Sequence, residues 1–175
     1  GTSVVHRVQV ENQSGEVMPF SLGYHPGFAC PFDAAHGTQD YVLRFVAPQT
    51  PAVVEVDEAT GLVTGGTHTL FENGTDIPLT DHLFDHDSIC MTNLTARSLS
   101  LVEAGTGRGV SVDITGFPYV LVWSVKGPVQ FVCIEPWHGL PDAANATGEW
   151  LEKPATVRLA PDESWGTQLC MTFHL

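Results

Sequence analysis

The chain has 175 residues, 43% of them hydrophobic, and contains 17 glycines and 12 prolines. This length and composition predict one folded domain over residues 1–175, with a hydrophobic core and many turns. Seven lysines and arginines stand against twenty aspartates and glutamates, so the formal net charge is −13. Such a charge disfavours binding to nucleic acid or to anionic membrane surfaces, and the longest apolar runs are too short to cross a bilayer.

The cysteines and the first residues bear on the cellular compartment. Four cysteines are widely spaced, and three of them lie in apolar segments. This favours buried free thiols over a disulfide framework or a zinc site. Residues 1–10 lack the charged and apolar regions of a secretory signal, so a cytoplasmic location is the expectation.

Short runs with period-two alternation, rich in β-branched and aromatic residues, recur along the chain between turn residues. They predict strands at residues 4–11, 18–24, 41–46, 98–103, 109–114, 119–124, 129–135, 156–159 and 166–174. Residues 47–89, rich in Gly, Thr, Asp and Pro, are interpreted as an elaborate loop or irregular strands. Helical periodicity extends no further than a turn or two, so the predicted fold class is an all-β antiparallel sandwich.

A carboxylate in the sequence FVCIEPWHGLPD, residues 131–142, is the first candidate for chemistry. An apolar run ends in Glu135, and Pro136 cannot donate a ladder hydrogen bond, so the strand is predicted to stop there or to lie at a sheet edge. Desolvation beside Trp137 would raise the pKa of Glu135 toward that of a useful general base. The alternative interpretation is a solvated acid at a strand exit.

The segment FSLGYHPGF, residues 20–28, has the same pattern. A β-run leads to His25, which precedes a proline and is flanked by Gly23 and Gly27. An imidazole held at a strand end can serve as an acid or base near neutral pH, although a histidine in such a place, taken alone, is more often a turn residue satisfied by a backbone hydrogen bond. Paired with Glu135, it forms a constellation suited to proton transfers on a neutral polar substrate.

Two further groups of residues are candidates for binding. In DHLFDHD, residues 81–87, a helix would place His82 and His86 on one face, but the HExxH motif and a third ligand are missing, so no functional metal is expected. An exposed acidic loop explains this segment most simply, and carboxylates that bind substrate hydroxyls are the functional alternative. Trp123 and Trp137 are candidates for stacking on a sugar ring, with core or rim packing as the alternative.

Several segments together point to a known family. The sequences SLGYHPGF, PLTDHLFDHDSI, ITGFPYVLVWS, FVCIEPWHGLPDA and WLEKPATVRLAPDESW, in this order and spacing, resemble the aldose 1-epimerase (galactose mutarotase) superfamily, and look closest to its LacX-like branch. The resemblance covers about residues 4–173. It implies a galactose mutarotase-like super-sandwich and a cofactor-free interconversion of the α and β anomers of a hexose.

The resemblance also implies roles for individual residues. The position of His25 corresponds to a general acid on the ring oxygen, and that of Glu135 to the base that takes the proton from the C1 hydroxyl. Opening of the ring, rotation about C1–C2 and closure on the other face then exchange the anomers. An aspartate that binds sugar hydroxyls falls within residues 81–87, with Asp85 as the first choice and Asp87 as the second.

One departure from the family pattern bears on partners. Members of the family usually have nearly twice this length, and the chain resembles their C-terminal part, without counterparts of the arginine and additional histidine that line the sugar site. A sandwich without its N-terminal strands would leave strand edges and apolar surface uncovered. A homo-oligomer or a complementing N-terminal chain is therefore expected.

Three competing hypotheses remain from the sequence. The first is a carbohydrate-binding β-sandwich without turnover, and the second is a metal-dependent enzyme centred on His82 and His86. The third is a relative that acts on sugar phosphates, which is disfavoured because a phosphate needs a basic clamp and the seven basic residues are scattered.

Overall fold

The computed structural model describes residues 1–175 as two large antiparallel sheets and a small ribbon. The first sheet has the order β1 (Ser3–Glu11), β15 (Ser164–His174), β11 (Gly109–Asp113), β10 (Ser98–Glu103), β5 (Tyr41–Gln49) and β8 (Gly74–Pro78). The second has the order β3 (Leu22–Gly23), β13 (Phe131–His138), β12 (Tyr119–Trp123), β9 (Ile89–Thr92), β6 (Ala52–Val56) and β7 (Val63–Thr69), and β4 (Gly27–Ala29) also pairs with β13. The ribbon joins β2 (Met18–Phe20) to β14 (Val157–Leu159).

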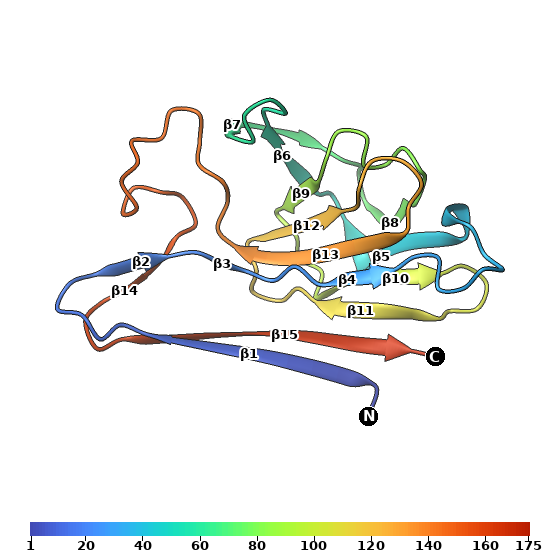
Figure 1. Cartoon of the computed structure of the whole chain (residues 1–175), viewed down its shortest axis with the longest axis horizontal. Coiled ribbons are helices and arrows are strands. Elements are labelled where there is room, and N and C mark those ends of the chain that lie inside the picture. Colours follow the sequence, from blue (N-terminus) through green and yellow to red (C-terminus); the bar gives the residue numbers. More distant parts are fainter.

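The arrangement of these elements confirms the predicted all-β antiparallel sandwich. Figure 1 shows β1 and β15 side by side along one border of the molecule, with both termini at the same end. The loop between β13 and β14 projects at the opposite end. The helical content is one 3-10 turn, η1 (Thr38–Asp40), and no helix is long and apolar enough to span a membrane.

All nine predicted strand regions contain strands, and the segment 18–24 is divided between β2 and β3. Residues 47–89 are more regular than their composition indicates, because they contain β6, β7 and β8. Burial explains why strands form here: Val53, Val54 and Ile77 are packed away from solvent, and tertiary contacts of this kind override weak local preference. In β7 the alternation is hidden by two consecutive glycines, Gly65 and Gly66.

The prediction that the strand stops at Glu135 or lies at an edge is wrong, since β13 continues through Pro136 to His138 between β12 and the short strands β3 and β4. The backbone pairing gives the physical reason. Val120 of β12 lies opposite Pro136 on one side, and on the other side the Pro136 carbonyl accepts a hydrogen bond from the Tyr24 amide. The missing amide hydrogen of the proline therefore falls where the ladder to β3 and β4 is already interrupted, which is a position that tolerates proline.

The main core lies between the two sheets and contains 22 buried residues. Alternate residues of β13, Val132 and Ile134, belong to this core, and β12 contributes Val120 and Val122. Because successive side chains of a strand point to opposite faces, Cys133, Glu135 and Trp137 lie on the other face of β13. All four cysteines are free and three are buried, which confirms the prediction of free thiols.

Candidate active site

A three-residue bulge between β3 and β4 places His25 beside Glu135. Gly23 at the end of β3 pairs with Trp137, whereas Gly27 at the start of β4 pairs with Cys133. The intervening residues 24–26 are tied down at both ends, because the Tyr24 amide donates to the Pro136 carbonyl at 3.1 Å and the Ile134 amide donates to the Pro26 carbonyl at 3.3 Å. Residue 25 is therefore held over the middle of β13.

The two predicted acid–base residues meet in this bulge. The Nε2 atom of His25 is 3.3 Å from Oε1 of Glu135. Their environments differ, since 56% of the His25 side chain is exposed and only 3% of the Glu135 side chain. A buried carboxylate and an accessible imidazole therefore lie close enough together for a proton to pass between them.

The pKa of Glu135 is strongly perturbed. Burial raises it from 4.5 to about 7, and the negative charge of Asp87 adds to the increase. Among the histidine, lysine and arginine side chains, only His25 comes within 4.0 Å of the carboxylate. A carboxyl group with a pKa close to the working pH is well suited to take and return a proton.

Asp85 and Asp87 occupy different surroundings, although both lie in the turn that precedes β9. Oδ2 of Asp85 lies 3.0 Å from Nδ1 of His82, so this carboxylate is engaged with its neighbour in the turn. Asp87 has a positive φ of 73°, and its charge acts on Glu135. The charge of Asp87 contributes to the raised pKa of Glu135, whereas Asp85 is not among the causes of that increase.

His82 and His86 do not converge on a common site. His82 pairs with Asp85, whereas Nδ1 of His86 lies 2.9 Å from Oε1 of Glu58. Both imidazoles are largely exposed. The metal-centred hypothesis therefore gains no support from the arrangement of these two side chains.

Trp123 and Trp137 lie on either side of the His25–Glu135 pair and have different contacts. The Trp123 ring meets the His25 ring edge to face, with centroids 5.8 Å apart. The indole nitrogen of Trp137 instead donates a hydrogen bond of 3.1 Å to the carbonyl of Tyr24, within the bulge. A side chain at Gly23 would collide with the Trp137 indole, so glycine is required where the ring packs on β3.

Sequence reasoning missed the part that Trp137 plays in holding the bulge. The signal was present, because Cys133, Glu135 and Trp137 are spaced two residues apart and must share one face of β13. It could not be used, because the partner of the indole is a backbone carbonyl more than a hundred residues away.

A second polar cluster, also missed from the sequence, surrounds Glu103 at the end of β10. Glu103 is 1% exposed, and its carboxylate accepts hydrogen bonds from Thr106 at 2.6 Å, Tyr41 at 2.7 Å and Arg108 at 2.8 Å. These donors lower the pKa of Glu103, with Thr106 and then Tyr41 as the largest causes. Arg108 also donates to Asp33 at 2.6 Å, so the cluster already contains its own cation.

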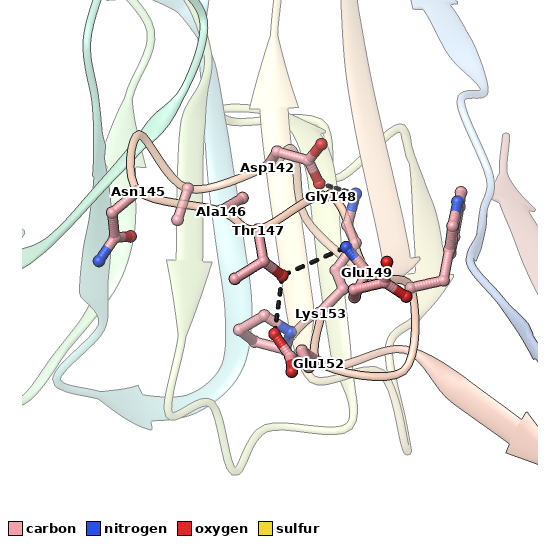
Figure 2. Close-up of a pocket in the computed structure, with 11 residues that line it drawn as sticks. Asp142, Asn145, Ala146, Thr147, Gly148, Glu149, Glu152 and Lys153 are labelled. Carbon is pink, nitrogen blue, oxygen red and sulfur yellow. Dashed lines mark hydrogen bonds and ion pairs between the residues drawn. The ribbon is translucent and has the colours of Figure 1, made fainter.

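A third region, in the loop between β13 and β14, contains a hollow lined by polar side chains (Figure 2). Lys153 pairs with Asp142 at 2.7 Å across it, and Thr147 donates to Glu152 at 2.7 Å. These internal pairs hold the loop together, and none of the predicted site residues lines this hollow.

Comparisons with known proteins identify the family of the chain. The sequence model of the family described as aldose 1-epimerase matches residues 2–165. The protein LacX (chromosomal) of Lactococcus lactis subsp. lactis is 31% identical over 163 residues, which are 92% of this chain and 54% of LacX. The chain therefore spans about half the length of the curated relatives it matches.

Solved structures show the same scaffold. The galactose mutarotase related enzyme of Lactobacillus acidophilus superimposes with a TM-score of 0.90 at 26% identity, covering 99% of this chain and 58% of that one. A galactose mutarotase-like protein of Lactobacillus casei gives a TM-score of 0.84 at 24% identity, with 97% and 58% covered. The sandwich is thus the galactose mutarotase-like fold.

Proposed function

Because the chain belongs to the aldose 1-epimerase family, we propose that its His25–Glu135 pair interconverts the α and β anomers of a hexose. The observation that carries the proposal is the 3.3 Å contact between an accessible imidazole and a buried carboxylate. A general acid and a general base at this separation can act on two oxygens of one small polar molecule.

The proton transfers balance without a redox step. Glu135 takes the proton of the C1 hydroxyl, the electron pair left on that oxygen forms the C1 carbonyl, and the bond from C1 to the ring oxygen breaks. The ring oxygen takes a proton from His25. Rotation about C1–C2 exposes the other face of the aldehyde, and the reverse transfers close the ring. Both side chains return to their starting protonation states, so no cofactor enters the reaction.

The difference in exposure between the two groups suits their roles. The buried carboxyl of Glu135, with its pKa near 7, takes up a proton at neutral pH far more readily than a solvated glutamate. The exposed imidazole of His25 lies on the side from which a sugar approaches. Trp123, against the His25 ring, is the proposed apolar surface for the sugar.

Substrate hydroxyls are assigned to Asp87 in this proposal. The Asp87 charge acts on Glu135, whereas the Asp85 carboxylate is engaged by His82, and this favours Asp87 over the first choice from the sequence. Trp137 is assigned a positioning role, because its indole nitrogen is bonded to the backbone of the bulge.

A partner is part of the same proposal. Strand β1 is nine residues long, pairs with β15 without a register shift, contains no proline and leaves Val4 and Val5 50% and 42% exposed. A long apolar edge of this kind is a template for another strand. The proposed occupant is the part of the fold that the longer relatives contain beyond the 58% matched here.

Size-exclusion chromatography with light scattering, combined with amide hydrogen exchange, tests the partner. A monomer in which the β1 amides that point away from β15 exchange rapidly fits a missing complementary segment. A stable dimer in which these amides are protected would show instead that a second copy covers this edge.

Anomer exchange is the test of the activity. Freshly dissolved α-glucose and α-galactose are followed by polarimetry at a pH where spontaneous mutarotation is slow, with wild type and with His25→Ala and Glu135→Gln. Acceleration that both substitutions remove is the expected result. A folded chain that binds either sugar by NMR titration without accelerating exchange would favour the non-catalytic carbohydrate-binding alternative.

A further inference from the structure

Three side chains of different chemistry converge at the bulge. A ring nitrogen of His25, Sγ of Cys133 and a carboxylate oxygen of Glu135 all lie within 4.8 Å of one another. Cys133 and Glu135 are two residues apart on β13 and therefore share its outer face, while the bulge brings His25 over them. The proposed acid–base mechanism uses His25 and Glu135 and leaves the thiol without a role.

We propose that a soft divalent cation of the Zn²⁺ type binds between His25, Cys133 and Glu135 and inhibits the chain by occupying its acid–base pair. Binding stands on geometry alone, whereas inhibition rests on the function proposed above. On binding, the thiol forms a bond to the metal through its sulfur and its proton passes to the buffer, so no oxidant or reductant is needed.

The distances fit such an ion. Zinc bonds of about 2.0–2.3 Å to nitrogen, oxygen and sulfur imply ligand atoms about 3.3–3.7 Å apart in a tetrahedron. The separation of His25 Nε2 and Glu135 Oε1 is 3.3 Å, and the thiol is within reach after a shift of about 1 Å. One sulfur and one imidazole favour Zn²⁺ over Mg²⁺ or Ca²⁺, which prefer oxygen ligands alone.

Access and charge favour the same site. His25 is more than half exposed and offers an entry path to the two buried ligands. A Cβ at Gly27 would lie 3.3 Å from Cys133 Sγ, so the absence of a side chain there leaves the flank of the thiol uncrowded. The nearby charge of Asp87 and the net charge of −13 attract cations.

The other convergent group in the chain provides a contrast. Asp33, His36 and Glu103 also bring their polar atoms within 4.8 Å of one another. There, however, Arg108 donates to both Asp33 and Glu103. A guanidinium already pairs with both carboxylates of that cluster, whereas no lysine or arginine lies within 4.0 Å of Glu135.

Titration of the whole chain with Co²⁺ tests binding without reference to activity. Cobalt takes the ligands of Zn²⁺ and absorbs light, so a site with a thiolate gives a charge-transfer band in the near ultraviolet and stronger visible bands. We expect both in wild type and in Cys170→Ser, which removes a more accessible thiol on the other sheet. Cys133→Ser should lose the charge-transfer band, and added Zn²⁺ should remove all bands from wild type.

Because Cys133 is buried, Cys133→Ser could lose the bands by failing to fold. His25→Ala provides a second variant without this problem. Because His25 is exposed, this variant is expected to fold and to bind Co²⁺ at least about tenfold more weakly. Absence of the bands in wild type, persistence of the charge-transfer band in folded Cys133→Ser, or unchanged affinity in His25→Ala would each overturn the proposal.

Mutarotation assays address the inhibitory part. Zn²⁺ is expected to lower the wild-type rate reversibly, with recovery on adding EDTA, and the concentration for half inhibition should rise at least about tenfold in Cys133→Ser. If the chain gives the cobalt bands but does not accelerate mutarotation, the proposed function is wrong and the metal site stands. Mutarotation that Zn²⁺ leaves unchanged would remove the inhibition and retain the function.

Discussion

Glu135 and Glu103 are both buried, yet their pKa values are displaced in opposite directions. Burial raises the pKa of Glu135 to about 7, whereas hydrogen bonds from Thr106 and Tyr41, with Arg108, lower that of Glu103. The first carboxyl faces an imidazole that is exposed to solvent, and the second is enclosed by donors of the protein itself. Burial therefore does not determine the state of a carboxyl group, because the donors that surround it decide whether it stabilises the fold or is available to exchange protons.

The largest expected effect is at Glu135. Glu135→Gln keeps the shape of the side chain and removes the base, so kcat for mutarotation should fall by about 10²- to 10⁴-fold. Circular dichroism should show an unchanged fold. The matched control is Glu103→Gln, which should lower stability while folded molecules keep their rate; equal losses of rate in both variants would contradict the contrast between the two glutamates.

The donors around Glu103 are tested by Tyr41→Phe. The Tyr41 hydroxyl donates to Glu103 at 2.7 Å and accepts from the Phe32 amide at 2.8 Å, and both bonds are lost without a change in ring volume. Unfolding free energy should fall by about 1–3 kcal/mol, measured by urea denaturation with an unchanged m-value. Tyr119→Phe, in the second sheet, is the control and should change stability little.

A rise in pH is expected to change the stability contributed by the two glutamates in opposite directions. Mutarotation needs ionised Glu135, so kcat/KM should fall about tenfold per pH unit below about 7. Because the folded pKa of Glu135 is raised, its contribution to stability is present below pH 4.5 and is lost as the pH rises through about 7. The lowered pKa of Glu103 gives the opposite sign, with stability lost as the pH falls below 4.5.

Denaturation curves across this range check the signs. In Glu135→Gln, the unfolding free energy should decline less between pH 4.5 and about 7. The loss of stability below pH 4.5 should remain in this variant. A decline that persists in this variant would mean that another group titrates there.

The smallest expected effect concerns the bulge at residues 24–26, which lies beside Glu135 and has no counterpart beside Glu103. Trp137→Phe removes the hydrogen bond from the indole to the Tyr24 carbonyl and loosens the segment that holds His25. We expect a loss of kcat of about two- to tenfold with little change in KM, as for one neutral hydrogen bond. Trp150→Phe, at an exposed tryptophan of the loop between β13 and β14, should leave both constants unchanged; a change in KM alone for Trp137→Phe would support a sugar-stacking role instead.

The fold class and the location of most strands could be predicted from the sequence, because alternation and turn residues are local properties of the chain. The sequence also singled out His25 and Glu135, since each precedes a proline after a β-run. Strands at residues 52–56 and 63–69 lie in a segment rich in Gly, Thr, Asp and Pro. Tertiary contacts revealed them, through the burial of Val53 and Val54 in β6 and the pairing of β7 with β6.

Tertiary structure decided everything that depends on residues distant in the chain. The bulge at residues 24–26, the meeting of His25 with Glu135, the bond of Trp137 to Tyr24 and the enclosure of Glu103 all arise from strand pairing across long separations. Each of the two glutamates follows a predicted strand in the sequence. Their opposite pKa displacements follow from the neighbours that the fold supplies, because desolvation and hydrogen bonding are properties of the packed environment rather than of the residue.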